Sequence, residues 1–171
     1  MIRLLSALSL SMLLLSLCAC GPTDANGSTS GSAAEDHEGH EHPELAAAMT
    51  QMQHYTQKLG YSIQGKNQPL AAFYLHEVEE LGAMITEEIP TYEGHEIAKL
   101  MGIMFTPQIE PLEREVNASN WEGAERAYAA LINNCNSCHA SSAHGFIQVT
   151  VPSGPAPFNQ VFEAAGSGAG Q

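Results

Sequence analysis

Between residues 43 and 144 the apolar residues recur every three or four positions, which is the spacing of one face of an α-helix. The pattern predicts four amphipathic helices separated by short links. The first begins near Pro43 and ends at a connection over residues 60–66. The second starts at Asn67, a favourable N-cap, and ends at Pro90. Helices of this length joined by short links favour an all-α fold, an antiparallel four-helix bundle.

The third and fourth predicted helices complete the bundle. The third helix spans residues 92–116, and Pro107 and Pro111 are expected to kink or split it, because each removes an amide donor and crowds the preceding turn. The fourth helix is capped near Ser119 or Asn120. Val78 is expected at the flank of the second helix. The inner face of that helix is expected to consist of Leu70, Phe73, Tyr74, Glu77, Leu81, Met84 and Ile85.

The N-terminal residues differ in character from the rest of the chain. Arg3 is followed by an apolar run too short to span a membrane, so residues 1–19 indicate an export signal peptide. The run ends in Leu-Cys-Ala-Cys at residues 17–20, which resembles the lipobox of bacterial lipoproteins. That resemblance implies a lipid on Cys20 and, with Gly21 next, an outer-membrane anchor facing the periplasm. An ordinary signal peptide with incidental cysteines is the alternative.

Two further segments flank the predicted bundle. Residues 20–42 are rich in small and acidic residues and predict a flexible, disordered tether. The tether contains a His-acid run at residues 35–42, which either holds a transition metal loosely or is a solvated linker. Residues 145–171 are rich in Pro and Gly and predict an irregular tail whose first part could lie extended along the bundle.

The net charge of the chain indicates which classes of molecule it can bind. The chain has 19 acidic and six basic residues and a formal net charge of −13. This balance disfavours nucleic acid and anionic lipid, and would attract a protein partner with a basic docking face, although an acidic surface also serves solubility alone. No Ser/His/Asp set, carboxylate pair or phosphate loop stands out, so no enzymatic activity is expected. Glu77, an acid among apolar residues, is expected at a partly exposed flank.

A Cys-x-x-Cys-His string, hereafter the attachment motif, closes the predicted fourth helix with Cys135, Cys138 and His139. This string is typical of covalent attachment of one c-type haem. Two cysteines three residues apart on a helix present both sulfurs to one porphyrin edge, and the histidine offers a nitrogen to the iron as proximal ligand. The alternatives are a disulfide, a thioredoxin-like site, and a zinc site that also uses His144.

A four-helix bundle that ends in this motif resembles the cytochrome c-prime family and its low-spin relatives. The likeness covers residues 43–144 in architecture. Short segments also look like small exported bacterial cytochromes c: Met49-x-x-Met52-Gln53, Lys58-Leu59, Asn67-x-x-Leu70-Ala71-x-Phe73-Tyr74 and Gly145-Phe146-Ile147. The resemblance implies covalent haem c in a helical bundle. Relatives often dimerise through their first two helices, so a homodimer stays open.

The sixth position of the iron can be approached from helix geometry. In an antiparallel bundle the early turns of the first helix lie level with His139, and both Met49 and Met52 fall on its inward stripe. In the low-spin relatives a first-helix methionine binds the iron, so Met49 is the candidate sixth ligand and Met52 the second candidate. The alternative is that both methionines simply fill the core.

Other histidines and tyrosines are weaker candidates. Three histidines are not expected to bind the iron: His54 and His76 as surface residues, and His95, which lies near the haem end but opposite the apolar face of its helix. Three tyrosines are expected in the core with a hydroxyl that could bond a haem propionate: Tyr55, Tyr74 and Tyr128.

The leading functional hypothesis is a lipid-anchored, periplasm-facing carrier of single electrons, because methionine–histidine ligation and a rigid bundle suit electron transfer. A five-coordinate haem protein that binds or senses nitric oxide or carbon monoxide is the alternative. A peroxide-handling enzyme and a metal-buffering lipoprotein that uses the His-acid run are two further interpretations.

Overall fold

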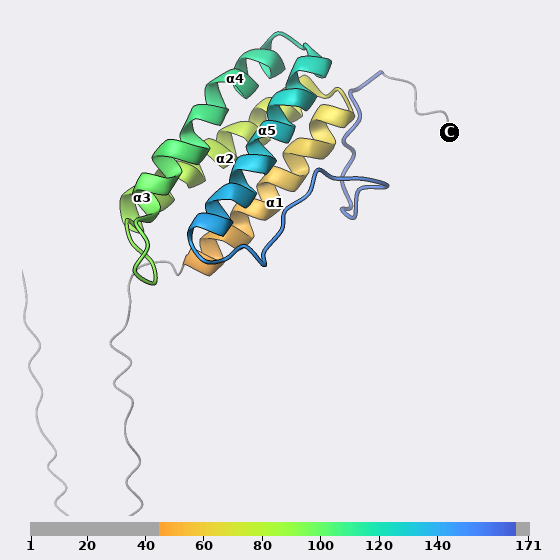
Figure 1. The fold of residues 1–171 in the computed structure, drawn as a ribbon. Coiled ribbons are helices and arrows are strands. Elements are labelled where there is room, and N and C mark those ends of the chain that lie inside the picture. Colours follow the sequence, from red (N-terminus) through yellow and green to blue (C-terminus); the bar gives the residue numbers. More distant parts are fainter. Residues whose placement is uncertain (1–44, 167–171) are drawn as a thin grey trace, which may run out of the picture. The chain divides into compact units, whose positions relative to one another are not determined.

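The computed structural model describes residues 45–166 (Figure 1), all of which belong to one compact unit. Within this range the chain forms helices and irregular segments, with one isolated bridge and no strand, so the all-α prediction is confirmed. No helix in this part of the chain is both long and apolar enough to cross a membrane. The predicted signal peptide, the lipidation site at Cys20 and the His-acid run lie outside the described residues.

The first helix, α1 (Leu45–Gln64), is longer at its C-terminal end than predicted. The connection was expected from residue 60, but Gly60 lies inside the helix and is buried. A Cβ atom at Gly60 would lie 2.7 Å from the Tyr128 hydroxyl and 2.8 Å from Cγ of Pro152. Gly60 therefore allows a close approach of neighbouring segments instead of ending the helix. The chain leaves the helix later, where Lys66 adopts a φ of 53°.

The second helix, α2 (Gln68–Glu88), has the predicted ends. The Asn67 side chain accepts a hydrogen bond from the amide of Leu70 at 3.3 Å, which caps the helix. The last helical residue is Glu88, two positions before Pro90. Both predicted boundaries are confirmed because they depend on local chemistry, an N-cap and a proline.

The predicted inner face of α2 is wrong in part. Phe73 is 52 % exposed, whereas Val78, expected at the flank, is fully buried. The structure adds Ala71 and Leu75 to the buried set. The reason is that α2 packs against both α1 and α4, so the side of α2 that carries Ala71, Leu75 and Val78 is buried between them. Glu77 is partly exposed, as expected for a flank position.

The third predicted helix is a composite. It begins with α3 (Ile97–Leu100), passes through a π-helical turn (Met101–Phe105) and continues as α4 (Thr106–Asn117). The predicted start at residue 92 is wrong, because Tyr92 and His95 exchange backbone hydrogen bonds in a tight turn. The expected interruption exists, but it directly precedes Pro107, which takes a first-turn position in α4. Pro111 lies inside α4 and does not end it.

The last helix, α5 (Trp121–Ser141), begins as predicted. The Asn120 side chain accepts a hydrogen bond from the amide of Gly123 at 3.3 Å. α5 packs against α1 and α4. The shared core contains large, fully buried aliphatic side chains from α1, α2, α4 and α5: Leu59, Ile63, Ile85, Leu112 and Leu131.

The chain after α5 is irregular, as predicted, and its described part is attached to the helices (Figure 1). The carbonyl of Pro152 accepts a hydrogen bond from the Gln64 side chain at 2.8 Å. Further along, the Tyr74 hydroxyl donates to the Gln160 side chain at 2.8 Å, and Phe162 is buried in the core. The tail is therefore part of the packed unit.

Candidate functional site

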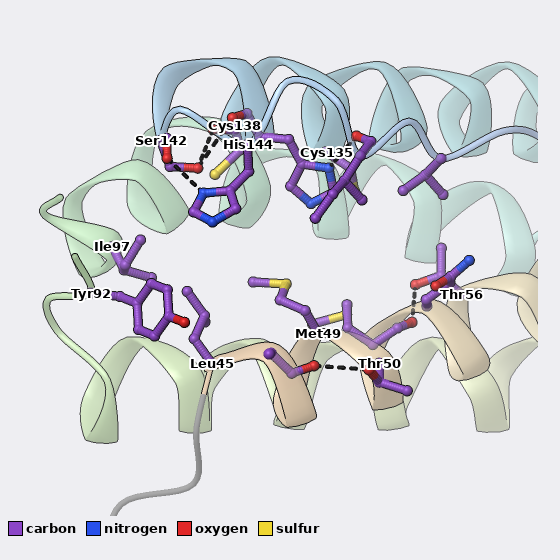
Figure 2. Close-up of a pocket in the computed structure, with 16 residues that line it drawn as sticks. Leu45, Met49, Thr50, Thr56, Tyr92, Ile97, Cys135, Cys138, Ser142 and His144 are labelled. Carbon is purple, nitrogen blue, oxygen red and sulfur yellow. Dashed lines mark hydrogen bonds between the residues drawn. The ribbon is translucent and has the colours of Figure 1, made fainter.

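A cavity of about 300 Å³ lies between the beginning of α1 and the end of α5 (Figure 2). This volume is at the lower end of the range typical of small-molecule sites. Leu45 lies at the start of the α1 wall, and Tyr92 and Ile97 close one end of the cavity. The first turns of α1 and the last turns of α5 share it, and Gly60 late in α1 lies beside Tyr128 early in α5, so these two helices run in opposite directions. We call it the α1–α5 cavity.

The α1–α5 cavity brings together the residues that the sequence singled out within the described range. Five predicted site residues line it: Cys135, Cys138, His139, Met49 and Met52. Figure 2 shows Met49 extending from α1 towards the α5 wall that carries Cys135 and Cys138. The attachment motif and the two methionines are 83 residues or more apart in sequence, so their convergence is a tertiary property of the fold.

The imidazole of His139 has a defined hydrogen-bond partner. Its Nδ1 atom lies 2.9 Å from the backbone oxygen of Ile147. A carbonyl oxygen can only accept, so Nδ1 carries the hydrogen in this contact. In the neutral ring the other nitrogen, Nε2, then has a free lone pair, which is the form that binds a metal.

The two cysteines of the attachment motif are free thiols, both partly buried. Burial raises the pKa of Cys135 to about 11, with a further contribution from the neighbouring Cys138. Burial also raises the pKa of Cys138. Both thiols are therefore protonated at neutral pH. Thioredoxin-like cysteines have a lowered pKa and lie at helix N-termini, so neither condition of that alternative is met here.

The opposite wall is built from uncharged groups. Met52 is 7 % exposed and Met49 is partly buried, so the thioethers sit in a protected environment. No Asp, Glu, Lys or Arg is among the lining residues. Two thiols and one oriented imidazole that face two thioethers in an apolar cavity are the donor groups by which proteins hold a c-type haem, and an apolar lining suits a hydrated ion poorly.

His144 also lines the cavity, which bears on the zinc interpretation. Its Nδ1 lies 2.7 Å from the carbonyl oxygen of Ser142, and its Nε2 lies 3.7 Å from a carboxylate oxygen of Glu93. Within residues 45–166, no three His, Cys, Asp or Glu side chains are grouped so that they could hold a metal ion together. A Cys₂His₂ set is therefore not assembled in this part of the chain.

The weaker candidates lie elsewhere. None of the three tyrosines named for a propionate lines the cavity, and the Tyr128 hydroxyl donates instead to the Thr56 carbonyl at 2.9 Å. His54 and His76 are exposed, as expected, and His76 lies 3.5 Å from the Glu80 carboxylate. His95 belongs to the turn before α3 and does not line the cavity.

Sequence reasoning missed several residues of the wall. Tyr92 was placed in a helix, although Glu93 and Gly94 after it have positive φ values of 48° and 81° and form a turn. Ile147 and Val149 contribute from the tail. The signal for these two was present, because they alternate with polar residues at the spacing of an extended segment. Their position against α5 was not readable from that spacing.

Comparisons with known proteins identify no relative: no protein-family model, no curated protein and no solved structure matches the chain.

Proposed function

We propose that this protein is a monohaem c-type cytochrome that carries single electrons. The observation behind the proposal is the convergence of the attachment motif and two methionines on one apolar cavity. A five-residue string can arise by chance. A string whose histidine is oriented by a carbonyl, and which faces thioether sulfurs across a cavity, meets independent geometric requirements for the same cofactor.

Each of the site residues that line the cavity would have its own role in holding the haem. Cys135 and Cys138 would hold the haem covalently, each through a thioether that results from addition of its S–H bond across a vinyl group. His139 would bind the iron through Nε2 while Ile147 holds Nδ1. Met49, or in its place Met52, would supply a further protein ligand to the iron. When bound, the haem supplies an iron that accepts and releases one electron.

The proposal includes an antiparallel four-helix bundle of the cytochrome c-prime type. The opposite directions of α1 and α5 and the core shared by α1, α2, α4 and α5 support it. In the family a first-helix residue faces the iron, and Met49 and Met52 occupy that helix here. The composite α3, π-helical turn and α4 would form the third member of the bundle.

The cellular setting is proposed from the sequence. Residues 1–19 and Cys20 support export and a lipid anchor in the outer membrane, on the periplasmic side. The net charge of −13 supports a redox partner with a basic docking face and no binding of nucleic acid. Electron transfer, without catalysis by the protein itself, is the function that we propose.

Mass and absorption spectra of the purified protein test the proposal. We expect the mass of the chain to increase by one haem that denaturant does not remove. Sharp bands of the reduced protein and the weak far-red band of a methionine-bound oxidised iron should accompany it. Met49→Ala should abolish the far-red band, whereas Met84→Ala on α2, outside the cavity, should leave it unchanged. A chain without covalent haem would refute the proposal.

The gas-binding alternative is supported by one feature of the α1 wall. Leu45, one turn before Met49, is buried and lines the same cavity, so an apolar side chain is also available opposite the motif. If neither methionine binds the iron, the oxidised spectrum should be broad and the reduced protein should shift on addition of carbon monoxide. The absence of any shift would refute this alternative.

A further inference from the structure

The chain turns back on α5 directly after the attachment motif. Ala143 adopts a φ of 62°, and the amide of His144 donates to the carbonyl of His139 at 2.7 Å. The amide of Ile147 then donates to the carbonyl of His144 at 2.8 Å. This path carries residues 142–149, which we call the return segment, back over the last turns of α5.

Asn136, the first of the two residues between the cysteines, holds the far end of the return segment. Its side-chain Nδ2 donates to the backbone oxygen of Val149 at 2.9 Å, and its Oδ1 accepts from the amide of Val149 at 2.8 Å. The amide group thus satisfies both backbone groups of one residue, as a neighbouring strand would. Ser137, the other intervening residue, bonds only within the helix, to the carbonyl of Asn133 at 3.0 Å.

The same segment supplies the hydrogen-bond acceptor of the histidine. The Ile147 carbonyl lies 2.9 Å from Nδ1 of His139, two residues before the anchored Val149. Ile147 and Val149 line the α1–α5 cavity, although Ile147 is also 45 % exposed to solvent, whereas Gln148 between them does not line it. An extended segment places alternate residues on one side, so anchoring Val149 also orients Ile147.

We propose that Asn136 is a positioning residue for His139. By anchoring Val149 it holds the Ile147 carbonyl against Nδ1, which selects the ring tautomer with a free lone pair on Nε2. The inference rests on the proposed function only in naming haem iron as the partner of Nε2. A hydrogen bond to the second nitrogen of a ligating histidine fixes its orientation and raises its basicity. Asn136 would therefore also favour the oxidised iron and lower the reduction potential.

The test compares two substitutions inside the attachment motif. Asn136→Ala removes both bonds to Val149, whereas Ser137→Ala removes one bond internal to the helix and serves as the control. NMR of ¹⁵N-histidine-labelled protein gives the exchange rate of the His139 Nδ1 hydrogen. Loss of two hydrogen bonds should raise this rate in Asn136→Ala on the order of tenfold. The reduction potential should rise in the same variant, and Ser137→Ala should match the wild type in both measurements.

A second variant leaves the motif intact. Val149→Pro removes the amide that Asn136 Oδ1 accepts, and should raise the exchange rate less than Asn136→Ala. Exchange rates unchanged in both variants, or raised equally by Ser137→Ala, would overturn the role of Asn136. A failure of the proposed function can be distinguished from a failure of this inference, because mass spectrometry of the wild-type protein shows whether the chain carries haem. The exchange of the His139 hydrogen can still be measured in that chain.

Discussion

The packing at Gly60 yields a prediction that is independent of any cofactor. Gly60 faces Tyr128 on α5 and Pro152 on the tail, so it sits where α1, α5 and the tail meet. Replacing it with alanine adds a single Cβ atom. That atom would lie 2.7 Å from the Tyr128 hydroxyl oxygen and 2.8 Å from both Cζ of Tyr128 and Cγ of Pro152. Real Cβ atoms do not approach their neighbours this closely, so something must move.

The balance of two opposing effects sets the size of the change. Alanine is favoured over glycine in a helix interior by about 1 kcal/mol. Against this, overpacking of a buried site costs about 1–3 kcal/mol. Relief by moving Tyr128 would break its 2.9 Å hydrogen bond to the Thr56 carbonyl, which costs about 1 kcal/mol more. We expect Gly60→Ala to lower the free energy of unfolding by about 1–3 kcal/mol, since the two unfavourable effects together exceed the helix preference.

Urea unfolding followed by far-ultraviolet circular dichroism measures this change. Gly102→Ala is the matched control, because no atom lies within 4 Å of a Cβ placed at this exposed glycine. The control should leave stability unchanged or raise it. A Gly60→Ala protein as stable as the control would mean that the close contact of α1 with Tyr128 and Pro152 does not exist, and the packing reasoning would be refuted.

Two further predictions concern titratable groups in the core and the cavity. Burial raises the pKa of Tyr128 far above its ordinary value, so the unfolded chain loses this proton at a lower pH than the folded protein. Stability should therefore fall as pH rises above about 10, and Tyr128→Phe should flatten this fall in urea titrations at several pH values; an unchanged slope would contradict the assignment. Cys135 and Cys138 should not react with iodoacetamide in denaturant if they form thioethers, whereas alkylation of both Cys135 and Cys138, located by peptide mass spectrometry, would exclude haem attachment.

The sequence predicted those features of the fold that depend on neighbouring residues. Asn67 was predicted as an N-cap, and Asn120 was one of two candidate caps beside Ser119, because an Asn side chain can accept from an amide three residues later. The predicted helix over residues 92–116 was expected to be kinked or split by Pro107 and Pro111, and a π-helical turn lies just before Pro107, whereas Pro111 does not end α4. The predictions were wrong where contacts between segments far apart in the sequence determine the structure. Gly60 looked like a connection, and only its contact with Tyr128 and Pro152 explains a glycine inside α1.

The same distinction between local sequence and long-range packing applies to the candidate site. The sequence by itself singled out the candidate residues, because two cysteines, a histidine and two methionines have recognisable spacings on single helices. Only the tertiary structure decided that α1 and α5 bring these residues to one cavity. It also decided that the Ile147 carbonyl meets Nδ1 of His139 and that Asn136 holds the segment in place. Helical spacing is a local property of the backbone, whereas the partner of a side chain depends on how the whole chain packs.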